Sequence, residues 1–337
     1  YLYVNSNDTA KEMRVVKCLN PECTSSTSYK VDDANNTNVN APSIAIGADG
    51  FPVVVHYHYG VGPRFVKCGS ADCGTVSSVS TLDTSGNQPG QSPSVVIRTN
   101  GLPIVAYKEG GLNRNLRVYD CSNSSCSSGT VYNIASAGGG WDCSVGIGLD
   151  SIPRIASHVN SSNYLRFYTC ANGSCSSATY NMLDSSGKVY SGIRLTYGAD
   201  GLPVIAYGVS GTWGVSVVKC GNADCSSGNT ITALLSGSAV FNDPWMTMSP
   251  DGYPVVAYIN GPAYGSRKLY VVRCGNAACS SGNVTVQVDT SVTDVDNPSI
   301  TVGVDGNPVL AYRDAVNYDL KVAKCANPWC LSGWMRK

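Results

Sequence analysis

Residues 320–330 of the chain read LKVAKCANPWC, an alternating run that ends in two cysteines five positions apart. The same cysteine spacing occurs seven times along the 337 residues, and successive pairs begin 49 to 54 residues apart. A period near 50 residues over a whole chain indicates an array of one supersecondary unit. The pairs use fourteen of the 15 cysteines and are Cys18/Cys23, Cys68/Cys73, Cys121/Cys126, Cys170/Cys175, Cys220/Cys225, Cys274/Cys279 and Cys325/Cys330.

Aligning the chain on these cysteines exposes four short segments in each repeat. The first is a small apolar run that ends in Asp-Gly, as in residues 42–50, and the second runs from proline to tyrosine, as in residues 103–107. The third alternates and ends at the first cysteine, and the fourth, such as residues 283–288, is rich in β-branched side chains. These lengths, compositions and bounding Gly, Pro and Asn residues predict strands, and no segment predicts a helix.

Four antiparallel strands in a unit of about 50 residues are typical of a propeller blade. The Asp-Gly or Asn-Gly pairs between the first two segments predict tight hairpins. The repeat therefore predicts an all-β fold, a seven-bladed β-propeller that forms a single domain over residues 1–337. The chain begins at a second strand, so we expect the N-terminal blade to lack its innermost strand. The approximate blades are 1–36, 37–87, 88–138, 139–187, 188–238, 239–292 and 293–337.

The cysteine pairs bracket the turn between the third and fourth strands of each repeat. This position favours one disulfide per blade, because residues that face each other across a hairpin end lie near bonding distance. The gap also fits half of a zinc site, but the repeat supplies no further ligands, so we expect no metal and no cofactor. Regular disulfides predict an oxidising location, secreted or on the cell surface. Cys143 is left over as a free thiol, where other repeats open with proline.

Composition excludes several classes of partner. Lys+Arg and Asp+Glu balance at 23 each, and only 14% of residues are charged. No basic stripe predicts nucleic-acid binding, and no apolar run is long enough to predict a membrane span. No segment reads as a signal peptide, so we expect Tyr1 to follow a processing boundary.

The units Pro-Ser-Ile-x-x-Gly-x-Asp-Gly-x-Pro-Val-x-Ala-Tyr and Leu-x-Val-x-Lys-Cys-x-Asn-x-x-Cys resemble repeats of secreted and surface propellers of bacteria, over the whole chain. More loosely, the fold is similar to sialidase-like and lectin propellers. A sialidase would bring three arginines that hold a carboxylate, a Tyr/Glu nucleophile pair, and Asp boxes with a tryptophan. The turns here lack that tryptophan. Candidate arginines are Arg98, Arg154, Arg194 and Arg313.

The connections between the second and third strands, and from the fourth strand to the next blade, vary in length and content. Loops held by a rigid scaffold carry function, so we expect any ligand at this variable end of the blades. Its aromatic rings suit sugars and protein partners alike, or cover blade edges. The candidate ligand-binding residues are Tyr59, Trp141, Tyr164, Tyr190, Trp213, Tyr264 and Tyr318, with Phe241 and Trp245 beside them.

One tyrosine position recurs at the end of the second strand. We expect it to pack between blades with its hydroxyl at a wet end. His56 occupies the same position, which favours packing over metal binding, although His56 and His58 lie on one face of a strand and His158 follows two blades later. The recurrent tyrosines are Tyr107, Tyr207, Tyr258 and Tyr312.

These patterns predict a non-enzymatic extracellular module that binds a glycan or a surface protein at the variable end. One alternative is a structural subunit of an extracellular filament or surface layer, which self-assembles when the incomplete blade accepts a neighbour's strand. A second alternative is a sialidase-like glycosidase or lyase. No paired carboxylates of the kind that glycoside hydrolysis needs stand out in the repeats, so no catalytic residue is assigned.

Overall fold

A computed structural model of the chain describes residues 2–5, 12–33, 39–86, 88–111, 114–136, 142–159, 161–211, 214–237, 243–261, 264–331 and 334–336. The chain divides into two compact units. Unit 1 comprises residues 1–17, 26–162 and 166–180, and unit 2 comprises residues 18–25, 163–165 and 181–337. Both are built from antiparallel sheets, and the described residues include no helix long and apolar enough to span a membrane.

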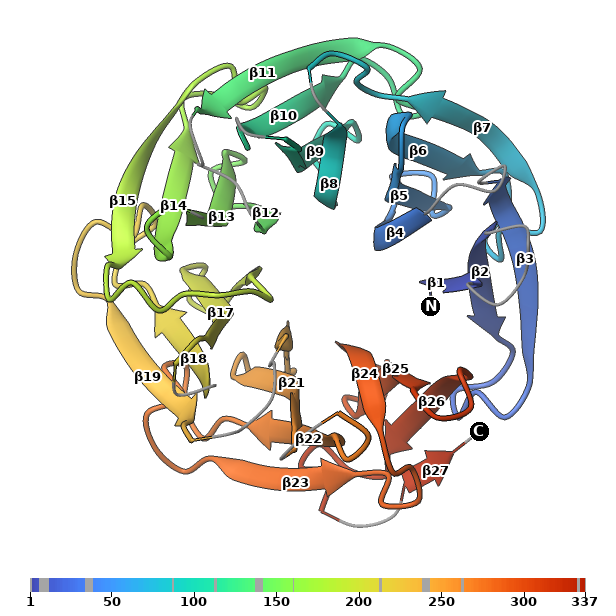
Figure 1. The fold of residues 1–337 in the computed structure, drawn as a ribbon, viewed down its shortest axis with the longest axis vertical. Helices are drawn as coiled ribbons and strands as arrows, with labels where there is room; N and C mark the ends of the chain where they lie inside the picture. The colour runs from blue at the N-terminus through green and yellow to red at the C-terminus, as the bar shows by residue number, and fades with distance from the viewer. Residues whose placement is uncertain are drawn as a thin grey trace. The chain divides into compact units, whose positions relative to one another are not determined.

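Unit 1 holds a three-stranded sheet, sheet A, and the four-stranded blades B and C, in which neighbouring strands follow chain order (Figure 1). Sheet A contains β1 (Leu2–Asn5), β2 (Glu12–Cys18) and β3 (Ser26–Asp33). Blade B contains β4 (Val39–Ile46), β5 (Pro52–His58), β6 (Gly62–Cys68) and β7 (Val76–Thr81). Blade C contains β8 (Pro89–Ile97), β9 (Pro103–Glu109), β10 (Leu116–Cys121) and β11 (Gly129–Ala135).

Blade D is divided between the two units, and blades E, F and G belong to unit 2. Blade D contains β12 (Cys143–Ile147), β13 (Pro153–Val159), β14 (Tyr164–Cys170) and β15 (Ala178–Asp184). Blade E contains β16 (Arg194–Tyr197), β17 (Pro203–Val209), β18 (Gly214–Lys219) and β19 (Thr230–Leu235). Blade F contains β20 (Trp245–Met248), β21 (Pro254–Asn260), β22 (Lys268–Arg273) and β23 (Val284–Val288). Blade G contains β24 (Val295–Val302), β25 (Pro308–Asp314), β26 (Leu320–Cys325) and β27 (Trp334–Arg336).

The predicted class, a β-propeller with four-stranded antiparallel blades and one disulfide per repeat, is confirmed. The count differs from the prediction, because the described residues form six four-stranded blades and one three-stranded sheet rather than seven clear blades. The single-domain assignment and its blade boundaries stay predictions.

All seven predicted cysteine pairs form disulfides. They are Cys18–Cys23, Cys68–Cys73, Cys121–Cys126, Cys170–Cys175, Cys220–Cys225, Cys274–Cys279 and Cys325–Cys330. The first cysteine of each pair ends the third strand or directly follows it. Every repeat is therefore closed by its own bridge, as the spacing predicted.

The two cysteines of a pair do not face each other across a hairpin end, contrary to our prediction. In the strand ladders, Cys68 lies opposite Val76 and Cys121 lies opposite Gly129. The second cysteine of each pair lies in the turn, before the fourth strand begins, so the bridge ties a strand end to its own turn. These turn residues are Cys23, Cys73, Cys126, Cys175, Cys225, Cys279 and Cys330.

The turn cysteines share a strained backbone conformation. All seven have a positive φ, between 52° and 57°, which an L-residue adopts only at a cost. In blade C, the Asn123 carbonyl accepts the Cys126 N–H at 3.1 Å, and its side-chain oxygen accepts the Ser127 N–H at 3.1 Å. The bridge and the asparagine together hold this conformation.

We predict that the disulfide and the positive φ contribute separately to stability. Removing the bridge with C121S/C126S lowers the free energy of unfolding by about 2 kcal/mol. C121S/C126G recovers about 1 kcal/mol of that loss, because glycine tolerates the positive φ. The matched control C121G/C126S recovers nothing, since Cys121 is a strand residue. Urea unfolding of the three variants measures this, and equal stabilities would contradict it.

The turn between the first and second strands is held by an ion pair that recurs with changing partners. In blade B, Lys67 Nζ lies 2.7 Å from Asp49, the aspartate of Asp-Gly. Blade C has Asn-Gly instead, and Arg98 pairs with Asp120 at 2.6 Å. In blade D, Arg154 holds Asp150 at 2.8 Å and lowers its pKa to about 2. The ion pair therefore belongs to the scaffold, although different sequence positions supply its two residues in different blades.

The recurrent tyrosines are buried between blades, as expected, but three of their hydroxyls are not at a wet end. Each of the three donates a hydrogen bond to an aspartate at the end of the preceding blade's outer strand. Buried polar groups need such partners. The pairs are Tyr107–Asp83 at 2.7 Å, Tyr207–Asp184 at 2.8 Å and Tyr312–Asp289 at 2.6 Å. His56 makes the equivalent contact with Asp32 at 2.9 Å.

Tyr107→Phe removes one of these links, and we predict a loss of about 2 kcal/mol in the free energy of unfolding, because a buried carboxylate loses a donor. Tyr258→Phe is the matched control. Tyr258 is equally buried, but it stacks on Tyr270 and Ser236 stands where other blades have the aspartate. Thermal denaturation compares the two variants. A loss for Tyr258→Phe as large as that for Tyr107→Phe would refute the hydrogen bond's role.

Candidate functional site

One serine position in the first strands links neighbouring blades. Ser43 Oγ accepts the Val95 N–H at 3.2 Å, and Ser94 Oγ accepts the Val145 N–H at 3.1 Å. Each of these serines lies opposite an alanine or valine of its blade's second strand. Four of the six first strands that the structure describes carry this serine, as Ser43, Ser94, Ser144 and Ser299.

Blades E and F depart from this pattern at adjacent positions in unit 2. The residue in the serine register is Arg194 in β16, opposite Ala206, and Trp245 in β20, opposite Ala257. The Arg194 guanidinium lies over the indole of Trp245, 3.8 Å from the ring centroid. A cation–π contact thus replaces the serine hydroxyl where these two blades meet.

Gly192 makes this contact possible. It lies two residues before Arg194, and its φ is +67°; Ala41, Ser92 and Asn297 also have a positive φ at the equivalent position of other repeats. A Cβ atom at this position would lie 2.4 Å from Cδ of Pro244 and 2.9 Å from Cα of Asp243. No larger residue fits without moving the backbone, so glycine sets the close approach of blades E and F.

Two aspartates and two arginines meet at the start of β24, next to blade F. Arg267 Nε and Nη2 each donate to Asp294 at 2.7 Å, a bidentate pair. Nη2 of the same arginine lies 3.6 Å from Asp296 Oδ2. Arg313 Nε lies 3.0 Å from Asp296 Oδ1, yet it is buried without an aligned hydrogen bond. Asp294 is therefore held by two charge-assisted hydrogen bonds, whereas Asp296 accepts a longer hydrogen bond from the neutral Asn297 Nδ2, at 3.3 Å.

The environments of these two carboxyls move their pKa values in opposite directions. The hydrogen bonds from Arg267 hold the pKa of Asp294 below its usual range, against the effect of burial. Burial raises the pKa of Asp296, by more than the guanidinium groups of Arg313 and Arg267 lower it, and the charge of Asp294 adds to the rise. Two neighbouring carboxyls with divergent pKa values are typical of acid–base catalysis.

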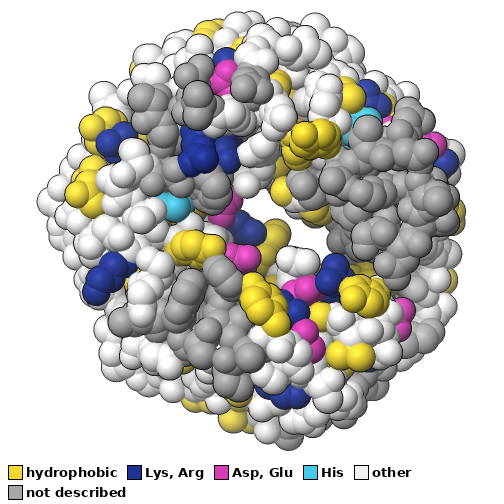
Figure 2. All heavy atoms as spheres, viewed as in Figure 1, with side chains coloured by type: hydrophobic (Ala, Val, Ile, Leu, Met, Phe, Trp, Pro, Cys, Tyr) yellow, Lys and Arg dark blue, Asp and Glu magenta, His cyan; other side chains and the backbone are white. Residues whose placement is uncertain are grey.

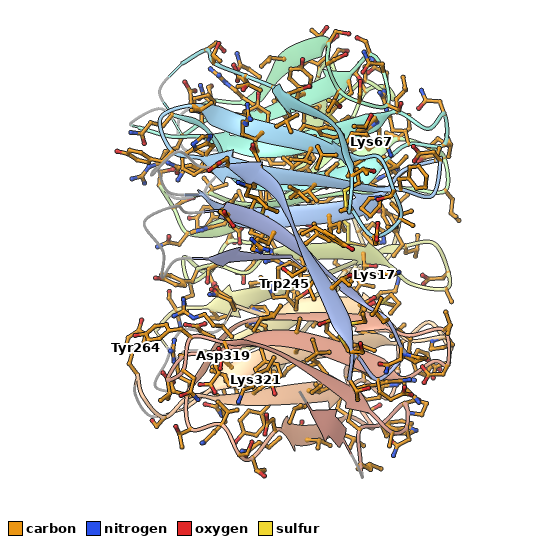
Figure 3. All side chains as sticks on the ribbon, turned by 90° about the vertical axis from the view of Figure 1, so that its right-hand side faces the viewer. Lys17, Lys67, Trp245, Tyr264, Asp319 and Lys321 are labelled. Carbon is orange, nitrogen blue, oxygen red and sulfur yellow. A yellow bond between two sulfur atoms is a disulfide. The ribbon has the colours of Figure 1, made fainter. Side chains whose placement is uncertain are left out.

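Exposed aromatic rings surround this pair. Tyr264 is 67% exposed and has Arg267 4.9 Å from its ring centroid, and Tyr318 is 56% exposed with Arg313 at 5.3 Å. In Figure 3, Tyr264 projects beyond the ends of the strands, with Asp319 and Lys321 on the same side. In Figure 2, acidic and basic side chains lie close to apolar ones on this face. Such a mixture suits a sugar, whose C–H faces stack while its hydroxyls form hydrogen bonds.

The two features are contiguous. Trp245 packs against the core cluster of blades F and G that contains Val295, which lies between Asp294 and Asp296 in the chain. We call the set the inner-strand site, and it lies wholly within unit 2. Tyr190 belongs to it because burial raises the pKa of its phenol and the charges of the nearby Asp243 and Tyr264 add to the rise. The members of the site are Tyr190, Arg194, Asp243, Trp245, Tyr264, Arg267, Asp294, Asp296, Arg313 and Tyr318.

Three of the seven sequence-predicted ligand residues belong to this site, namely Tyr190, Tyr264 and Tyr318. Tyr164 is partly buried at the start of β14. Tyr59 belongs to unit 1, where it is half exposed and meets Tyr57 edge to face. Trp141, Trp213 and Phe241 lie outside the described residues. Sequence analysis missed Arg267, Asp294 and Asp296, although the run Asp-Val-Asp before Asn297 and Pro298 was a visible signal.

The histidines and the leftover cysteine are buried scaffold residues. His56, His58 and His158 are all buried, and within the described ranges no three His, Cys, Asp or Glu side chains are grouped to hold a metal ion. Cys143 is outside the disulfides and is buried in the core cluster of blades C and D. Its thiol donates to the Ser92 carbonyl at 3.4 Å.

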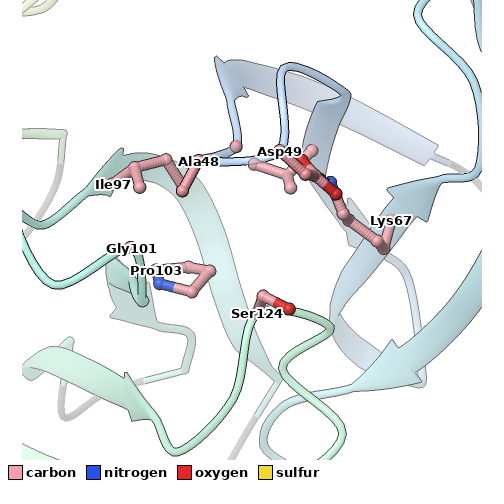
Figure 4. Close-up of a pocket in the computed structure, with 9 residues that line it drawn as sticks. Ala48, Asp49, Lys67, Ile97, Gly101, Pro103 and Ser124 are labelled. Atoms are coloured by element: carbon pink, nitrogen blue, oxygen red, sulfur yellow. Dashed lines mark hydrogen bonds and ion pairs between the residues drawn. The ribbon is translucent and has the colours of Figure 1, made fainter.

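A cavity of about 150 Å³ lies in unit 1 beside the Asp-Gly and Asn-Gly turns of blades B and C (Figure 4). Its charged lining residues, Asp49 and Lys67, are the scaffold ion pair of blade B. Because these charges neutralise each other and the cavity is small, we place no function there.

The four arginines considered for a sialidase-like carboxylate site are engaged in different ways. Arg98 and Arg154 belong to the ion pairs at the constant end of their blades, and Arg313 pairs with Asp296. Arg194 stacks on Trp245. They form no three-arginine cluster.

No family model and no curated protein matches the chain, but solved structures share its fold. A protein of unknown function from Dyadobacter fermentans is 13% identical, with a TM-score of 0.59 over 90% of this chain and 94% of its own. The α-L-arabinofuranosidase Arb93A from Fusarium graminearum is 11% identical, with a TM-score of 0.55 over 82% and 88%. The lectin SapL1, solved with α-methyl fucoside, is 12% identical, with a TM-score of 0.53 over 88% and 94%.

These neighbours correct the functional prediction. We predicted a non-enzymatic binding module, with a filament subunit or a sialidase-like enzyme as alternatives. The likeness to Arb93A contradicts the prediction of a non-enzymatic module, because Arb93A is a propeller of similar architecture and is a glycosidase. At these identities the likeness shows the fold alone, so activity has to be argued from the site.

Proposed function

We propose that the protein hydrolyses glycosidic bonds at the inner-strand site, with Asp296 as the general acid. The observation that carries the proposal is the pair of carboxyls on Arg267 whose pKa values diverge, lowered at Asp294 and raised at Asp296. A carboxylic acid with a raised pKa holds its proton to higher pH, and it can donate that proton to the leaving oxygen as the glycosidic bond breaks. Exposed rings beside it supply stacking surfaces for the sugar.

Asp294 acts through Arg267. Its bidentate contact neutralises the guanidinium, which would otherwise favour the anion of Asp296. We therefore assign Asp294 as a positioning residue. The second carboxylate that hydrolysis needs is Asp243, which is exposed at the start of blade F beside Trp245. It activates water or stabilises the positive charge that develops on the sugar ring.

Other features agree with a protein that meets glycans outside the cell. Seven disulfides suit an oxidising compartment. Two of the three neighbours, Arb93A and SapL1, were solved with sugar-like ligands, an iminosugar inhibitor and a fucoside. We also infer that sheet A is the incomplete seventh blade of the propeller.

Asp296→Asn should show the signature of a lost general acid. We expect hydrolysis of glycosides with poor leaving groups to fall by about 10²- to 10⁴-fold, and hydrolysis of dinitrophenyl glycosides to fall far less, because a good leaving group needs no proton. Asp243→Asn slows both kinds of substrate. Rates on a panel of aryl and alkyl glycosides measure the difference.

Asp319→Asn is the matched control, since Asp319 is exposed on the hairpin after β25 and is not part of the site. It leaves both rates unchanged. Absence of hydrolysis across the panel by the unmodified protein, or equal losses for Asp296→Asn on the two leaving-group classes, would overturn the proposal.

The pH profile gives a second test. An acid catalyst works only when protonated, so kcat/KM falls as the pH rises through the pKa of Asp296, which lies above the ordinary aspartate value of about 3.9. Arg313→Gln removes a cation that lowers this pKa, so we expect the basic limb to move to higher pH. A limb that moves to lower pH or stays in place contradicts the assignment.

A further inference from the structure

Arg194 differs in its partners from the other arginines of blades E to G whose side chains the structure describes. Arg267, Arg273 and Arg313 each pair with an aspartate. No carboxylate among the described residues pairs with Arg194. Its Nη1 donates to the Ile193 carbonyl at 2.7 Å, and its Nε is buried without a hydrogen-bond partner. A partly buried guanidinium without a counter-ion is costly to maintain.

The repeat shows that this cost is not imposed by the scaffold. Four other first strands fill the same register with serine, and two of these serines, Ser43 and Ser94, link neighbouring blades through the hydroxyl. The stack on Trp245 at 3.8 Å orients the guanidinium but leaves its charge uncompensated. The position therefore gains a fixed cation in the inner-strand site, beside β20 of blade F.

We propose that Arg194, held on Trp245, binds the carboxylate of an acidic sugar, so that the substrate glycan contains uronic acid residues. The planar guanidinium matches a carboxylate in a bidentate geometry, and a lysine would not. This subsite consists of one guanidinium stacked on an indole, whereas the carboxylate site of a sialidase consists of three arginines. The inference rests on the proposed function in taking a glycan as the ligand, but it concerns binding and not bond cleavage.

The test measures binding in the Asp296→Asn background, where the ligand is not cleaved. The probes are matched oligosaccharide pairs of equal linkage and length, galacturonate with galactose and glucuronate with glucose, titrated by calorimetry above the pKa of the uronate. We expect at least one uronate to bind about 10- to 100-fold more tightly than its neutral partner. Arg194→Gln and Arg194→Lys lose that preference.

Arg166→Gln is the matched control. Arg166 also stacks on an aromatic ring, that of Tyr180 at 4.4 Å, and its Nε is likewise buried without a hydrogen-bond partner, but it belongs to unit 1. It keeps the uronate preference. Thermal denaturation of each variant separates a lost subsite from a lost fold, and Arg194→Lys keeps the charge if Arg194→Gln fails to fold.

Equal binding of acidic and neutral partners, a preference that survives Arg194→Gln, or no binding of any uronate overturns the inference. Tighter binding of a sulfated oligosaccharide than of either uronate overturns the assignment to a carboxylate. None of these results decides the glycosidase proposal, which depends on the leaving-group dependence of Asp296→Asn. Conversely, tight uronate binding by a protein that hydrolyses no glycoside supports this subsite alone.

Discussion

An aspartate at the end of one blade's outer strand, hydrogen-bonded to a tyrosine or histidine inside the next blade, is the contact on which the blade packing depends. Asp83 is buried and bonded to Tyr107 and Arg117 at once. A buried carboxylate tolerates no missing partner, so it fixes the distance between adjacent blades. The first strands are then held in register, and side chains placed on them keep a constant geometry.

The repeat also helps to identify functional residues, because these residues depart from it. Residues that recur, such as the cysteines, the turn ion pairs and the first-strand serines, are explained by packing. Arg194, Trp245 and Asp296 break the pattern within three consecutive blades, and each has an energetic cost that packing does not require. Arg194 is a cation without a counter-ion, Trp245 replaces a serine hydroxyl, and Asp296 is a carboxyl that is poorly solvated as an anion. Such local conflicts are expected at functional sites.

Much of the fold could be predicted from the sequence because disulfides, hairpin turns and strands depend on neighbouring residues. Cys18 and Cys23 pair within one turn, and Asp49-Gly50 closes one hairpin. The link from Tyr107 to Asp83 was missed because the two residues belong to different blades, although an aspartate 14 or 15 residues after the first cysteine recurs at Asp32, Asp83, Asp184 and Asp289. Asp294 and Asp296 were missed for the same reason, since Arg267 meets them from another blade.

We propose that the departures from the repeat in blades E, F and G together form one sugar site. A crystal structure of the Asp296→Asn protein with a bound acidic oligosaccharide tests it most directly. We expect a sugar ring beside Trp245, its carboxylate on the Arg194 guanidinium, and its glycosidic oxygen within hydrogen-bonding distance of the side chain at position 296. A glycan bound at the constant end of the blades, or only to residues of unit 1, would contradict it.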